Sequence, residues 1–202
     1  MNSILKSISF IFHPLIMPLI GVIFYFSKSP RFIPIEIIQA KLVSISILTI
    51  ILPILIYYLL KTIGKTHSIY LRSAKERILP LGLNCIIIYL IVKRVFPPGE
   101  VLELYYFFIG ILLSNLTCFI LAILKFKASI HMIAVSGVFM FYIALSLHFG
   151  ININGTLALM AIITGAIASS RLHLEAHNYT ELIAGFCIGF LPQLTLLNYW
   201  LT

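Results

Sequence analysis

Long apolar runs constrain this chain more than any other feature. Most of them are near 20 residues long, which is the length an α-helix needs to cross a bilayer. A membrane β-barrel is excluded, because its strands are only about 10 residues long and alternate polar and apolar side chains. The sequence therefore predicts an all-α, polytopic transmembrane bundle of six to seven helices in a single domain, residues 1–202. The apolar segments are about 8–26, 41–60, 79–95, 102–124, 131–149, 156–170 and 181–200.

Prolines and charges refine this prediction. Pro14 and Pro18 interrupt the first segment, so we expect it to be kinked or partly interfacial. The chain is 61% apolar, and its net charge is +8. Lysines and arginines beside membrane helices meet anionic lipid head groups, so we expect a lipid bilayer and no nucleic acid as partner. The six acidic residues are all glutamates, which leaves few candidates for acid–base chemistry.

Three polar segments separate the apolar runs: 61–78, 125–131 and 170–181. Neighbouring polar segments are separated by two crossings, and an outward and a return crossing bring the chain back to the same side. All three should therefore lie on one membrane face, where distant residues can form one pocket.

The third polar segment holds Ser170-Arg171, five residues, His177, three residues and Glu181. If it is helical, His173, His177 and Glu181 share one face, because they recur every four residues. Glu181 can accept the N–H of His177 and leave the other ring nitrogen free to attack. Arg171 can bind phosphate oxygens with its fork of donors. This segment therefore predicts phosphate chemistry.

The other two polar segments supply an anion site and cations. Ser129 and His131 lie at a predicted helix start, where unpaired N–H groups and the helix dipole favour an anion. Ser129 is predicted to cap this helix and to donate to phosphate, and His131 to protonate a leaving oxygen. The first segment adds cations on the same face, namely Arg72, Lys75 and Arg77.

In order and spacing, the three segments resemble the type-2 phosphatidic acid phosphatase family. Its signature is Lys-x6-Arg-Pro, then Pro-Ser-Gly-His, then Ser-Arg-x5-His-x3-Asp. The third motif matches from Ser170 to Glu181, with Glu in place of Asp. The second is matched by Ala128-Ser129-Ile130-His131, which keeps the Ser and His but not the Pro or Gly, and the first loosely by RSAKERILP at 72–80. The resemblance covers about residues 61–190.

The resemblance implies a hydrolase of phosphoric esters or diphosphates that needs neither metal nor cofactor. His177 would be the nucleophile that forms a phosphohistidine, Glu181 would replace the family's aspartate, and His131 would be the general acid. The implied substrate is a phosphorylated membrane lipid of polyprenyl diphosphate, phosphatidic acid, phosphatidylglycerophosphate or lipid A type. The implied phosphate-binding residues are Arg171, Ser170, Ser129, Lys127, Lys75 and Arg77, with Arg72 as a substitute.

Three other hypotheses stay open. His173, His177 and Glu181 offer zinc ligands at helical spacing, as in a membrane metal enzyme or transporter, although nearby cations would repel a metal. A lipid-phosphate binder or carrier without turnover is favoured by the altered second motif. A phosphotransferase would pass the phosphate to another acceptor.

The orientation of the chain is not settled by its charges. If the first apolar segment spans, so that Lys6 is included, nine Lys and Arg lie on the face of the polar segments and five on the other, which favours the cytoplasm for that face. Five of the nine are predicted phosphate ligands, however, and without them the two faces are nearly equal. The resemblance implies a bacterial inner membrane with the site on its outer, periplasmic face.

Overall fold

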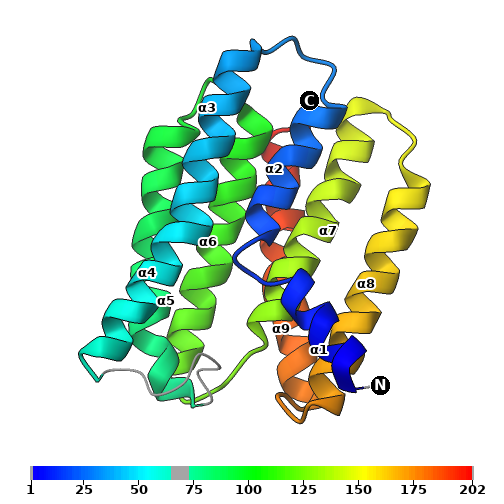
Figure 1. Ribbon diagram of the computed structural model, residues 1–202. Helices are drawn as coiled ribbons and strands as arrows, with labels where there is room; N and C mark the ends of the chain where they lie inside the picture. The colour runs from blue at the N-terminus through cyan, green and yellow to red at the C-terminus, as the bar shows by residue number, and fades with distance from the viewer. Residues whose placement is uncertain (1, 65–72, 202) are drawn as a thin grey trace.

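The computed structural model describes residues 2–64 and 73–201, and within them it is a bundle of α-helices with no strand (Figure 1). Six helices are long and apolar enough to cross a membrane. The prediction of an all-α polytopic bundle is therefore confirmed. These candidate spans are Ile35–Thr62, Ala74–Val95, Leu102–Ile123, Ile130–Phe149, Asn154–His173 and Tyr179–Tyr199.

The first two spans each contain a π-helical turn. Ile35–Thr62 is made of α3 (Ile35–Ser46), the π turn Ile47–Ile51 and α4 (Leu52–Thr62). Pro53 is the second residue of α4, just after this turn, and proline lacks the N–H that an α-helix needs four residues after an acceptor. The wider turn lets the helix continue past Pro53. α5 (Ala74–Leu90) likewise continues into the π turn Ile91–Val95.

The remaining spans form the compact half of the bundle. α7 (Ile130–Phe149) is the central helix, with most of its residues buried. It packs along α9, and both α6 and α8 contact it as well. The bounds of these neighbours are α6 Leu102–Ile123, α8 Asn154–His173 and α9 Tyr179–Leu196, which ends in the 3-10 turn Leu197–Tyr199.

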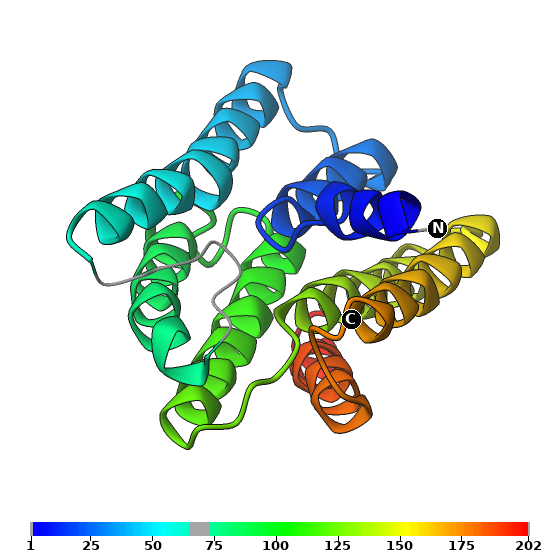
Figure 2. The same ribbon diagram turned by 60° about the horizontal axis from the view of Figure 1, so that its bottom comes forward.

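The first apolar segment is broken, as its prolines predict. It forms α1 (Asn2–Ile11) and α2 (Met17–Lys28), with Pro14 between them and Pro18 in the first turn of α2. α1 lies beside the C-terminal end of α8, while α2 continues into the bundle against α7 (Figure 1). In the turned view, α1 lies in front of α2 (Figure 2).

The polar segments meet at one end of the bundle, as predicted from the number of crossings. The described part of the first polar segment (61–78), the α6–α7 connection and the α8–α9 connection all lie at the bottom of Figure 1. At the opposite end, a fully buried carboxylate links three helices and the α2–α3 connection. Glu103 contacts Arg31 Nη2 at 2.7 Å and His148 Nε2 at 3.1 Å, and it accepts the hydroxyl of Tyr25 at 3.2 Å.

Candidate active site

The turn 174–178 joins α8 to α9 and carries His177 of the third motif. Glu175 lies in the left-handed region with φ 50°, a conformation that does not continue a helix. Asn178 then caps α9, because its side chain accepts the N–H of Glu181 at 2.9 Å. The carboxylate of Glu181 accepts the N–H of Asn178 at 3.4 Å in return, which completes a capping box.

Because of this turn, the expectation that His173, His177 and Glu181 share one helical face is wrong. His173 is the exposed last residue of α8, His177 lies in the turn, and Glu181 lies in the first turn of α9. The three residues therefore do not share one helical face. The zinc hypothesis depended on that face, and no group of three His, Cys or carboxylate side chains that could hold a metal occurs in residues 2–64 and 73–201.

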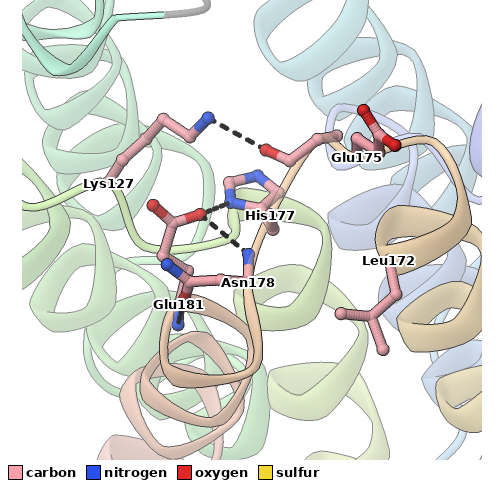
Figure 3. A pocket seen from close by; sticks show the side chains of 7 residues that line it. Lys127, Leu172, Glu175, His177, Asn178 and Glu181 are labelled. Atoms are coloured by element: carbon pink, nitrogen blue, oxygen red, sulfur yellow. Dashed lines mark hydrogen bonds and ion pairs between the residues drawn. The ribbon is translucent and has the colours of Figure 1, made fainter.

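His177 and Glu181 form a close pair. Nδ1 of His177 lies 2.6 Å from Oε2 of Glu181, and His177 is only 6% exposed (Figure 3). A carboxylate can only accept, so Nδ1 carries the proton and donates it. The lone pair is then on Nε2, the nitrogen on the other side of the ring. The pair thus leaves on Nε2 the lone pair that a nucleophile needs.

The electrostatic surroundings keep His177 neutral. Its pKa is lowered to about 4, chiefly by burial, against the hydrogen bond to Glu181, which raises it. The positive charges of Arg77 and Lys127 lower the pKa further. At neutral pH the ring therefore holds one proton, on Nδ1, and its Nε2 stays unprotonated.

The three polar segments are joined by hydrogen bonds to backbone atoms. Lys127 Nζ donates to the carbonyl of Ala176 at 2.9 Å, and this bond links the α6–α7 connection to the α8–α9 turn. Arg77, on α5, donates from Nη1 to the carbonyl of Ala128 at 2.9 Å. The backbone N–H of Ser129 donates to the carbonyl of Glu181 at 3.1 Å. These contacts hold the second motif beside the third.

Cations gather around this junction. Burial is the main reason that the pKa of Lys127 is lowered; Glu181 opposes this, while Arg77 and Arg171 add to it. The two guanidinium groups therefore lie within electrostatic range of Lys127. Arg77 is itself buried, with 6% of its surface exposed. Like charges brought together at a partly buried site favour a bound anion.

An open pocket of about 400 Å³ lies at this junction. Figure 3 shows Lys127 reaching over the His177–Glu181 pair from the neighbouring connection. The pocket is lined by Lys127, Leu172, Glu175, Ala176, His177, Asn178 and Glu181.

Ser129 occupies the N-cap position of α7 but does not cap it with its side chain, contrary to the sequence expectation. The hydroxyl is fully buried and has no hydrogen-bond partner in the part of the chain that the structure describes. Its backbone N–H is already bonded to Glu181. A buried hydroxyl without a partner is costly, so a ligand that accepted its proton would be favoured there.

Among the described residues, Lys127 is the only predicted phosphate ligand that lines the pocket, and Arg77, Ser129, Ser170 and Arg171 lie outside its lining. Lys75 is exposed and is not among the residues that line the pocket. Ser170 is buried, and its hydroxyl is 2.7 Å from the hydroxyl of Ser9 on α1. Arg72 lies outside the described residues.

His131 faces α1 instead of lining the pocket. Its Nε2 donates to the carbonyl of Ser9 at 3.2 Å, and its ring makes an edge contact with His13 at 5.7 Å between centroids. Sequence reasoning did not assign Ser9 or His13 to the site. The only local signal was the proline after His13, which predicts that the first apolar segment does not cross the membrane as one straight helix.

The neutral state of His177 predicts a pH dependence of stability. The unfolded chain takes up a proton on this ring near the ordinary value of 6.5, whereas the folded protein does so only near 4. The unfolded state therefore binds more protons between these values, and the contribution of His177 to the free energy of unfolding should fall as pH drops from 6.5 to 4. Thermal unfolding in detergent from pH 4 to 8 measures this. The variant His177→Gln should lose that part of the slope; an identical slope in both proteins would contradict the assignment.

Comparisons of the chain with protein-family models, curated proteins and solved structures find no match. Its function has therefore to be inferred from the chemistry of the site.

Proposed function

We propose that this protein is a metal-independent lipid phosphatase that works through a phosphohistidine intermediate. The observation that carries the proposal is the His177–Glu181 pair, 2.6 Å apart, buried beneath Lys127 at the end of a membrane bundle. A neutral histidine held by a carboxylate is an activated nucleophile. The cations nearby supply the charge that a phosphate needs.

Phosphate would enter between the second and third motifs. Lys127 and Arg171 would neutralise its charge, and the hydroxyl of Ser129 would donate to one of its oxygens. Arg77 would act mainly by holding Ala128 in place, because its Nη1 is bonded to that carbonyl. Lys127 is already bonded to the carbonyl of Ala176 and Ser129 is fully buried, so these two donors would need little reorganisation to stabilise charge that develops during the reaction.

The reaction would have two steps. In the first, Nε2 of His177 attacks phosphorus, the bond to the lipid oxygen breaks, and His131 gives that oxygen a proton. Glu181 stabilises the positive charge that develops on the His177 ring. In the second, water attacks phosphorus, the N–P bond breaks, and inorganic phosphate leaves while His131 takes a proton from the water.

The substrate would be a phosphomonoester or diphosphate of a membrane lipid, because the pocket lies at the end of helices long enough to cross a bilayer. The candidate lipids are polyprenyl diphosphates, phosphatidic acid, phosphatidylglycerophosphate and lipid A. We place the protein in a bacterial inner membrane with the pocket on the periplasmic face, as the motif resemblance implies.

Release of inorganic phosphate by the purified protein tests this proposal. The detergent-solubilised chain should release phosphate from at least one of these lipids, and EDTA should leave the rate unchanged, because the mechanism uses only side chains. Loss of all turnover in EDTA, restored by a divalent metal, would contradict the mechanism. Absence of release from every lipid, by a protein that is folded, would contradict the phosphatase proposal itself.

One observation favours a second candidate, a lipid-phosphate binder without turnover. The proton on Nε2 of His131 is directed at the carbonyl of Ser9 and not at the pocket. A protein of this kind would bind a lipid phosphate in vesicles and release no phosphate from it. Lipid binding and phosphate release, both measured on the same preparation, separate the two functions: a phosphatase shows both, and a binder shows binding alone.

A further inference from the structure

The N-terminal helix contributes to the site in a way that neither the motifs nor the pocket reveals. α1 lies against the C-terminal end of α8 (Figure 1). Ser9, on α1, connects two motif residues at once. Its hydroxyl is 2.7 Å from that of Ser170, and its carbonyl accepts from His131 Nε2 at 3.2 Å. Ser9 and Ser170 are both buried.

The contact with Ser9 decides which nitrogen of His131 carries a proton. A carbonyl oxygen only accepts, so Nε2 of His131 must be protonated. The other nitrogen, Nδ1, has no hydrogen-bond partner among the described residues. The histidine is thus held by one nitrogen and left available at the other, as Glu181 holds His177.

The surroundings of the ring fix its position further. His13 packs edge-on against His131, and Nδ1 of His13 accepts the N–H of Leu15 at 3.3 Å, which fixes the His13 ring in turn. Arg171 and His177 lie within electrostatic range of His131. A phosphate bound at Arg171 would bring negative charge near this ring, which favours a second proton on His131, at Nδ1.

We propose that Ser9 is a positioning residue for the general acid: its carbonyl keeps one proton on Nε2 of His131, so that Nδ1 is the nitrogen that exchanges a proton with the leaving group. This inference rests on the proposed phosphatase function. When the phosphorus–oxygen bond breaks, the Nδ1 proton passes to the lipid oxygen and the alcohol leaves. Water returns a proton to Nδ1 when it releases the phosphate from His177.

The hydroxyl of Ser9 makes the proposal testable, because the carbonyl cannot be removed by substitution. Ser9→Ala deletes the bond to Ser170 that holds this part of α1, and Ser9→Thr keeps a hydroxyl at the same place. Phe10→Ala is the matched control: Phe10 is the next residue of the same helix and is 79% exposed.

The leaving group separates a positioning role from a merely structural one. An alkoxide leaving from a lipid needs a proton, whereas p-nitrophenolate leaves without one. Ser9→Ala should therefore lower kcat for a lipid phosphate by roughly 10- to 100-fold, with KM little changed, and should largely spare p-nitrophenyl phosphate. Ser9→Thr should restore kcat for the lipid, and Phe10→Ala should act like the native protein. An equal loss on both substrates, or no loss on either, would overturn the proposal.

A spectroscopic measurement decides the inference independently of turnover. In protein labelled with ¹⁵N-histidine, the native His131 should show the tautomer protonated at Nε2, and Ser9→Ala should show a mixture of both. His131→Asn identifies the signals. If the native protein releases no phosphate, the proposed function fails while this measurement still tests the contact. A native His131 protonated only at Nδ1 would overturn the inference even in an active enzyme.

Discussion

Replacing His177 by alanine is expected to lower phosphate release from a lipid phosphate by at least roughly 10⁴-fold. The reason is that the proposed nucleophile is removed, and the remaining proposed phosphate donors cannot form the N–P bond. No other described histidine can take the place of His177 beside Glu181, because His173 is exposed and His131 faces α1. Release of inorganic phosphate under saturating lipid measures the loss.

The matched control for this prediction is His173→Ala. His173 lies four residues earlier, at the end of α8, and does not line the pocket. It should keep the native rate. A second readout is the intermediate itself: native protein mixed with ³²P-labelled substrate and quenched in alkali should carry label that acid releases, and His177→Ala should carry none. Comparable turnover in His177→Ala would remove the phosphohistidine mechanism.

The architecture was predictable because the bilayer imposes a length on each apolar run. The parity of the crossings then placed the polar segments at one end, and their joint position follows from topology alone. The local structure of the third motif was misjudged, although its signal was present. Asn178 followed three residues later by Glu181 is the sequence pattern of a capping box, and it marks a new helix start between His177 and Glu181.

The role of α1 could not be read from the sequence in the same way. Ser9 meets His131 and Ser170 across more than 120 positions of the chain, and nothing in its neighbourhood distinguishes it from an ordinary serine. Contacts of this kind depend on how a broken helix folds back against its neighbours. The hydroxyl of Ser129 is another case, since only the structure shows that its backbone N–H, and not its side chain, makes the link to Glu181.

The close approach of α7 and α9 brings the second and third motifs together, and it depends on two glycines one helical turn apart. A Cβ at Gly185 would lie 2.7 Å from the carbonyl oxygen of Ser129. A Cβ at Gly189 would collide with the carbonyl oxygen of Ile133 and the hydroxyl of Ser136. Small residues at such positions let membrane helices pack backbone to backbone.

Gly189→Ala is therefore expected to destabilise the protein by about 1–3 kcal/mol, because α9 must move away from α7 to admit the methyl group. The hydroxyl of Ser136 donates to the carbonyl of Phe186 at 2.9 Å, and this bond would be strained by the same movement. Unfolding of the detergent-solubilised protein, followed by circular dichroism against temperature or denaturant, measures the change.

Gly165→Ala is the matched control, since a Cβ at Gly165 on α8 would meet nothing within 4 Å. It should be neutral or stabilising by up to about 1 kcal/mol, the usual gain when alanine replaces glycine inside a helix. Gly189→Ala should also lower phosphate release, because the bond from Ser129 to Glu181 lies on the interface that is forced apart. If both variants unfold like the native protein, the tight α7–α9 interface does not hold the site together. If Gly189→Ala loses stability and keeps full activity, the site tolerates a wider spacing between its motifs than the bond from Ser129 to Glu181 allows.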